Sequence, residues 1–146
     1  MRNFKKRLLF ILFGLIFFCP AALSQIDIQQ ELDTGATAVN KIFNMYSSYS
    51  QAGFDSVVSN DFMPLRSEFM SKVDASAVNE QALEFNVSVD QVLILEKKMA
   101  VMCQWYKKFT VSKTPGQQKT QGKSELIFQL EGDQWKLVKL NGDNPF

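Results

Sequence analysis

The chain contains no histidine, and its 146 residues include two cysteines, Cys19 and Cys103. Histidine is the commonest general acid or base near neutral pH and the commonest metal ligand in proteins. Its absence excludes a Ser-His-Asp or Cys-His nucleophile, and with so few cysteines a zinc site is excluded as well. We therefore expect no metal and no cofactor, and any acid-base chemistry has to use carboxylates with tyrosine or basic side chains.

Three further side chains are candidates for a binding site or for the core. Trp105 and Trp135 lie in segments with strand patterning and could line a pocket, because ligand sites are mostly apolar with few polar groups. Packing in the core is the alternative for both. Cys103 is in phase with Val101 and Trp105, which predicts a buried, unreactive thiol.

The first 24 residues have the three parts of a secretory signal peptide. A basic start, Met1–Arg7, precedes an uncharged run of 12 residues, Leu8–Cys19, and small residues follow up to Ser24. Ala22 and Ser24 then occupy the two positions before the cut that require small side chains. We expect export to a periplasm or to the medium, with cleavage after Ser24.

Two other roles for this segment are an uncleaved membrane anchor and lipid attachment at Cys19. A helix needs roughly 20 apolar residues to cross the hydrocarbon core, and this run is shorter. Phe18 stands where a lipoprotein signal has a small residue. We therefore expect the protein to contact the membrane only through its export signal.

Residues 25–146 are predicted to form one domain that is mildly acidic. They hold 12 basic and 15 acidic residues, and nucleic-acid binding lacks its usual basic surface. Residues 25–96 are mainly acidic and residues 97–146 mainly basic, which indicates either solvated outer faces or a surface that steers a charged partner. Only Cys103 remains in this part, so no disulfide can form within it.

Helical periodicity fills the first half of the predicted domain. The clearest helix is expected over Ala36–Ala52, with Gly53 ending it in a left-handed conformation. A shorter helix is expected around Phe54–Asn60, and Pro64 is suited to open a third. These helices would each bury one apolar face.

The second half has the two-residue periodicity of strands. The alternation of apolar and polar residues is interrupted near Gln91, which indicates a bulge or a bend. The predicted segments are strands over Ala82–Leu95 and Met99–Val111, a polar loop over Thr114–Gly122, and strands over Leu126–Leu130 and Trp135–Leu140. Helices followed by strands predict an α+β fold with the helices on one face of an antiparallel sheet.

The segments Gly122–Phe128, Glu131–Leu140 and Asn141–Phe146, with an acidic-Gly-x-x-Trp turn at Glu131, form one closing hairpin. This hairpin resembles that of nuclear transport factor 2-like domains, in the broader cystatin-like group. The resemblance implies a cone-shaped domain with N-terminal helices packed on a strongly curved antiparallel sheet. It also implies a pocket between the concave face and the helices, for which Tyr46, Trp105 and Trp135 are candidates.

The resemblance implies many functions, including isomerases, dehydratases, epoxide hydrolases, transport factors and secretion-system subunits. The absence of histidine excludes the histidine-dependent dehydratases. In the isomerases and epoxide hydrolases, an aspartate abstracts a proton or activates water beside a tyrosine or arginine. Asp61, Arg66, Glu68 and Tyr46 have the required types, but no motif matches those enzymes, and helix capping, surface exposure and core packing are the alternative roles.

We therefore predict an exported, non-enzymatic domain that binds a small apolar ligand or an envelope protein through its cone pocket or sheet face. The alternative is a cofactor-independent isomerase or hydrolase with carboxylates in the pocket. A homodimer formed through the outer sheet surface is a third hypothesis, with Ala100, Met102 and Tyr106 on that face.

Overall fold

The computed structural model describes residues 20–112 and 114–146. The compact domain comprises Leu32–Phe146, and the chain before it is a separate unit. The predicted signal peptide lies mostly outside the described residues, as does Cys19, so cleavage after Ser24 stays a prediction. Within the described ranges, no helix is both long enough and apolar enough to cross a membrane.

Two helices replace the single one predicted over Ala36–Ala52. Helix α2 spans Pro20–Ser47, and α3 spans Gln51–Val57. The predicted role of Gly53 is wrong, because its N–H donates to Ser50 Oγ (3.1 Å) in the first turn of α3. Ser50 has an extended backbone and caps that turn, so a serine between the helices ends one and begins the next.

The second predicted helix also ends earlier than expected, because α3 stops at Val57. Strand β1, Val58–Met63, occupies part of the expected helix Phe54–Asn60. A cis peptide bond joins Met63 to Pro64, and helix α4 follows at Arg66–Asn79, as the position of Pro64 predicted.

Four long strands follow and form one sheet with β1. They are β2 (Glu80–Leu95), β3 (Lys98–Val111), β4 (Thr114–Glu131) and β5 (Gln134–Gly142), in the spatial order β1-β5-β4-β3-β2. All neighbours are antiparallel except β1 and β5, which are parallel. The predicted polar loop Thr114–Gly122 is wrong, because these residues pair with β3 and belong to β4.

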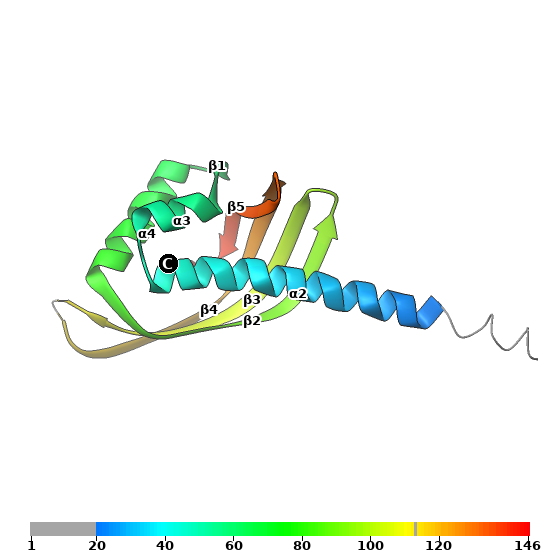
Figure 1. Cartoon of the computed structure of the whole chain (residues 1–146). Helices are drawn as coiled ribbons and strands as arrows, with labels where there is room; N and C mark the ends of the chain where they lie inside the picture. The colour runs from blue at the N-terminus through cyan, green and yellow to red at the C-terminus, as the bar shows by residue number, and fades with distance from the viewer. Residues whose placement is uncertain (1–19, 113) are drawn as a thin grey trace, which may run out of the picture. The chain divides into compact units, whose positions relative to one another are not determined.

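The α+β prediction is confirmed, with the core between the helices and one face of the sheet, but the sheet is mixed and not wholly antiparallel as predicted, because β1 is parallel to β5. Figure 1 shows the long strands β2, β3 and β4 bending along their length, with the helices on one side. The predicted slip near Gln91 is a register shift between Val89 and Gln91. Gly35 lets α2 approach β2 closely, because a Cβ there would lie 2.4 Å from Val92 Cγ2.

Candidate functional site

Aromatic rings fill the space between the helices and the sheet. Phe146 is 6% exposed and contacts rings from α2, α3 and α4. Its ring centroid lies 5.3 Å from Tyr46, 5.4 Å from Phe43 and from Phe54, and 6.2 Å from Phe69. The interior where the resemblance predicted a pocket is therefore occupied by the chain's own side chains around Tyr46.

A polar cluster lies within these rings and joins three separate elements. Tyr46 of α2 donates a hydrogen bond to Glu80 Oε2 at the start of β2 (3.4 Å). Lys107 Nζ of β3 lies 2.6 Å from the same oxygen, and the Lys107 side chain is 6% exposed. Burial, and then the negative charge of Glu80, raise the pKa of Tyr46 well above its usual value.

Lys107 is held by aromatic faces as well as by the carboxylate. Its ammonium lies 4.9 Å from the centroid of Phe109, 5.3 Å from Tyr46 and 5.9 Å from Phe85. Cation–π attraction of this kind strengthens when water is excluded. The cluster thus contains a carboxylate beside a tyrosine, but the carboxylate is already paired with a buried cation.

The weak catalytic candidates are not assembled into one site. Asp61 is exposed on β1, whereas Tyr46 is buried. Arg66 pairs with the Asp55 carboxylate and donates from Nε to the Ser59 carbonyl (3.0 Å), which ties α4 to α3 and β1. Asp61 and Arg66 therefore have surface and structural positions, and Tyr46 is joined instead by Glu80 and Lys107.

Sequence reasoning missed Glu80 and Lys107, although one signal for Lys107 was present. Lys107 follows Cys103 and Trp105 in the two-residue phase of β3, so its side chain is directed toward the core. A lysine in an inward phase needs a buried partner. Glu80 gave no comparable signal, because it stands at the junction of a helix and a strand.

The two tryptophans have different environments. Trp105 is 5% exposed, and its Nε1 donates to Ser124 Oγ (2.9 Å), so it packs in the core, and it also belongs to the lining of the groove described below. Trp135 is half-buried and lines a shallow hollow with Asp33, Lys41 and Asp133. Trp105 belongs to the buried core that contains Tyr46, and Trp135 packs against that core, but the hollow at Trp135 does not include Tyr46.

Cys103 is buried, as its phase predicted. Burial, and then the negative charge of Asp90, raise the pKa of its thiol from 9.0 to about 11. Residues 20–112 and 114–146 contain no group of three or more acidic or cysteine side chains that could hold a metal ion.

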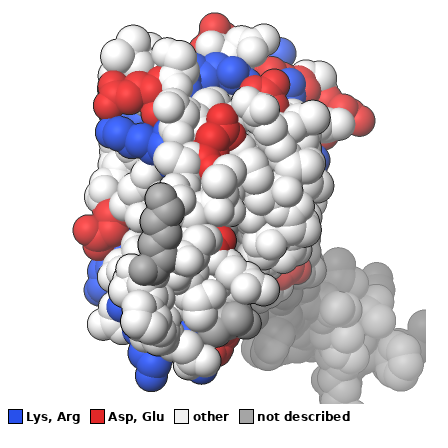
Figure 2. All heavy atoms as spheres, turned by 90° about the vertical axis from the view of Figure 1, so that its left-hand side faces the viewer, with Lys and Arg blue, Asp and Glu red and all other residues white. Residues whose placement is uncertain are grey.

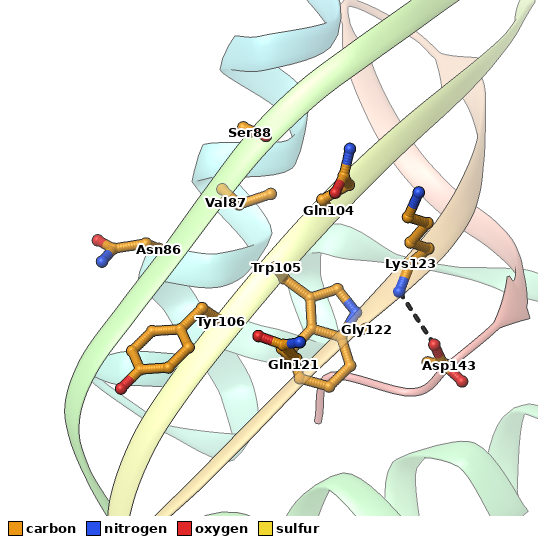
Figure 3. A pocket seen from close by; sticks show the side chains of 10 residues that line it. All are labelled: Asn86, Val87, Ser88, Gln104, Trp105, Tyr106, Gln121, Gly122, Lys123 and Asp143. Carbon is orange, nitrogen blue, oxygen red and sulfur yellow. Dashed lines mark hydrogen bonds between the residues drawn. The ribbon is translucent and has the colours of Figure 1, made fainter.

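An open groove lies on the other side of the sheet, which we call the outer-face groove. Gln104 and Tyr106 alternate along β3 with the buried Cys103 and Trp105, so they project from the outer face. The groove has a volume of about 460 Å³. Its polar lining, drawn in Figure 3, comprises Asn86, Ser88, Gln104, Tyr106, Gln121, Lys123 and Asp143, and Val87, Trp105 and Gly122 complete it.

The cross-strand register arranges these side chains in two rows. Asn86, Tyr106 and Gln121 are opposite one another on β2, β3 and β4, and Ser88, Gln104 and Lys123 form the next row. Gly122 lies between them, where a Cβ would be 2.6 Å from the Trp105 ring and 2.7 Å from Asp143. Gly122 is opposite Trp105 in the register, so a larger residue there would displace the buried Trp105 ring or Asp143 beneath the groove.

Charges of both signs are present on the surface. In Figure 2, Lys, Arg, Asp and Glu side chains gather along the upper margin of the face, and much of its centre is uncharged. The two signs are interspersed there. This distribution favours solvated outer faces over a single-sign steering surface on that side of the molecule.

Comparison with solved structures identifies the fold. A conserved protein from Planctomyces limnophilus has a TM-score of 0.63 and 13% identity, covering 74% of this chain and 94% of its own. A ketosteroid isomerase-like protein from Erwinia carotovora atroseptica has a TM-score of 0.63 and 10% identity, covering 79% and 98%. A nuclear transport factor 2-like superfamily protein from Salmonella enterica serovar Typhimurium has a TM-score of 0.63 and 10% identity, covering 84% and 94%.

The domain therefore has the nuclear transport factor 2-like fold that its closing hairpin predicted. No protein-family model matches the chain, and no curated protein matches it. At these identities the likeness concerns the fold alone, and this fold carries both binding and enzymatic functions.

Proposed function

We propose that the chain is exported and that its domain is a non-enzymatic binding module that works through the outer face of its sheet. One contrast carries this proposal: aromatic rings fill the interior around Tyr46 and Phe146, whereas the outer-face groove is open, with a volume of about 460 Å³. This volume lies in the range of about 300–1,000 Å³ that ligand sites usually have.

The packing of the interior makes ligand binding there energetically unfavourable. An apolar ligand in the cone would have to displace the Phe146 ring, which is 6% exposed and packed against four other rings. Displacing a packed aromatic ring loses both its buried area and its ring contacts. The outer-face groove requires no such rearrangement, and the sheet face is therefore preferred to the cone pocket.

An enzyme is the second candidate, and the contact between Tyr46 and Glu80 is the observation in its favour. A carboxylate beside a tyrosine hydroxyl is the pair that a cofactor-independent isomerase or hydrolase would use. However, the 2.6 Å contact with Lys107 already balances the charge of Glu80. A base that is paired with a buried cation and surrounded by packed rings is better suited to stability than to turnover.

A second copy of the chain is an alternative occupant of the outer face. Leu93 of β2 and Met102 of β3 are 62% and 47% exposed, and Ala100 lies opposite Leu93 in the register. These residues adjoin the groove along β3. Self-association would therefore cover the same face of the sheet, and the test below separates it from binding of another component.

The test is site-specific photocrosslinking in the cell that produces the full chain. A photoreactive phenylalanine analogue replaces Tyr106 in the groove or, as the matched control, Val78 of α4, which is 76% exposed. We expect adducts from position 106 and few from position 78, and mass spectrometry identifies the adduct as another component or as a second copy.

Equal adduct yields at the two positions, or none at position 106, would overturn the proposal. A defined substrate whose turnover is abolished by Glu80→Gln, while the fold is retained, would replace it with the enzyme. Adducts with a second copy alone would assign the face to a homodimer.

A further inference from the structure

We propose that the outer-face groove binds a neutral saccharide, an inference that rests on the proposed function of this face. The first argument is the type of its side chains. Three primary amides line it, those of Asn86, Gln104 and Gln121, together with the hydroxyls of Ser88 and Tyr106. Each amide offers donors and an acceptor, and each hydroxyl offers both, which matches a ligand made largely of hydroxyl groups.

The same lining argues against other classes of ligand. An apolar molecule would remove water from these amides without replacing their hydrogen bonds, and each such loss is unfavourable. A strongly charged ligand finds no net attraction, because the groove lining holds one cationic side chain, Lys123, and one carboxylate, Asp143. A neutral, polyhydroxylated molecule satisfies both conditions.

Tyr106 supplies the apolar surface that a sugar ring also needs. It lies in the middle strand of the groove, between Asn86 on β2 and Gln121 on β4. A tyrosine has an apolar ring body and a polar tip, so it can pack on the C–H face of a sugar while its hydroxyl bonds to the edge. Amides on both sides are then in place to bond the ring hydroxyls.

The groove amides are held in position by residues beside it. Gln104 Nε2 donates to Asp90 Oδ2 (2.8 Å), and Asn86 Nδ2 donates to Glu84 Oε1 (2.7 Å). The backbone N–H of Lys123 donates to Asp143 Oδ2 (3.0 Å), which fixes the wall of the groove at β4, as Figure 3 shows. Side chains ordered before binding lose less conformational entropy on binding, which favours a weakly attracted neutral ligand.

A second hollow extends the surface along the strands. It has a volume of about 490 Å³, shares Lys123 with the outer-face groove, and is lined by Asp90, Glu125 and Asn141 among others. Asn141 Nδ2 donates to Glu125 Oε2 (2.7 Å), so its amide is ordered in the same way. Met102 and Cys103 also line this hollow, so it offers apolar surface beside its polar groups, and two adjoining hollows suit several linked sugar units better than a single one.

The experiment is a titration of the ¹⁵N-labelled protein, purified as the cell exports it, with three probes: maltohexaose, cellohexaose and the hexamer of N-acetylglucosamine. We expect saturable amide shifts in β2, β3 and β4 around Tyr106 with at least one probe. Tyr106→Ala and Gln104→Ala should weaken binding at least tenfold and fivefold, as loss of a packing surface or a hydrogen bond does.

Gln129→Ala is the matched control, because Gln129 is an amide on β4 that lies outside the groove. It should change the affinity less than twofold. No saturable shift up to about 10 mM of any probe, a regime of very weak binding, would overturn the saccharide inference, as would shifts that leave the groove unaffected.

The two proposals fail in different ways. Crosslinks from position 106 to a protein, without saccharide binding, would leave the outer-face function standing and overturn the saccharide inference. Saccharide binding that Tyr106→Ala weakens, without crosslinks from position 106 in the cell, would support the site and overturn the proposed cellular role.

Discussion

Lys107 Nζ lies 2.6 Å from Glu80 Oε2 although 27 residues separate them, and the pair connects the middle of β3 to the junction of α4 and β2. Both side chains are largely withdrawn from water, with exposed fractions of 6% for Lys107 and 20% for Glu80. Two charges at such a site depend on each other, because either one alone would be left without a partner in a poorly solvated place.

The first prediction concerns this pair. Lys107→Met keeps the length of the side chain but removes the cation, so Glu80 loses its partner. We expect the free energy of unfolding to fall by about 2–4 kcal/mol, less than for a fully buried pair because Glu80 is partly exposed. Urea unfolding measures the change.

The double variant Glu80→Gln/Lys107→Met is the control for this prediction. It removes both charges and should recover most of the lost stability, giving a clear coupling energy in a double-mutant cycle. Additive losses in the two single variants would show that the pair is not coupled as the structure indicates.

The second prediction concerns the ring of Phe146 in the interior. Phe146→Ala removes a ring that contacts four others, and we expect a loss of about 3–5 kcal/mol in unfolding free energy. The vacated space is apolar, so a small aromatic such as benzene should bind there and raise the melting temperature of the variant.

Leu65→Ala is the comparison for this truncation, because Leu65 is 58% exposed. It should leave stability nearly unchanged and should not respond to benzene. If benzene raised the melting temperature of the original protein and of Phe146→Ala equally, the interior would not be filled in the way described.

The third prediction concerns the thiol of Cys103, whose pKa is about 11 in the folded domain against an ordinary 9.0. In the form of the protein that lacks residues 1–24, Cys19 has been removed and Cys103 is the cysteine that remains. At pH 8 the Cys103 thiol of this form should react with a disulfide reagent only after unfolding. The unfolded chain releases the thiol proton at lower pH than the folded one, so this contribution to stability is present below pH 9 and is lost as pH rises toward 11.

The loss should reach about 2–3 kcal/mol. Other groups also titrate in this range, so the measured quantity is the difference between the original domain and Cys103→Ala across a series of pH values. A difference that does not narrow with rising pH, or rapid labelling of the folded domain at pH 8, would contradict this prediction.

The fourth prediction concerns the signal peptide. The exported protein should begin at Gln25, which intact-mass measurement detects. Ser24→Leu places a large side chain directly before the cut and should block cleavage. Leu23→Phe changes a neighbouring position that has no such requirement, and it should be processed normally. Normal processing of Ser24→Leu would show that the signal peptide is cleaved at a position other than Ser24.

Several features could be predicted because they depend on neighbours along the chain. The strand phase of β3 buries Cys103 and Trp105, and the slip at Gln91 is a register shift in β2. The turn before Trp135 and the helices-then-strands order together indicated the nuclear transport factor 2-like fold. Side-chain periodicity is a local property, so a single sequence is enough to show it.

Other features depend on partners distant in the chain. Strand β1 is parallel to β5, and Val58 pairs with Leu137, so the strand exists because of a contact across nearly 80 residues. The polar composition of Thr114–Gly122 predicted a loop, but in the structure this segment forms backbone pairs with β3. Strand pairing is decided by tertiary contacts, and polar composition alone does not exclude it.

The candidate site was the least predictable part for the same reason. By itself the sequence determined the compartment hypothesis, the α+β order of elements, the buried phase of Cys103 and the exclusion of histidine chemistry. Only the tertiary structure decided that Phe146 fills the interior, that Glu80 meets Lys107, and that amides from three strands line one groove. These arrangements depend on the packing of elements and the register between strands, which local patterns do not specify.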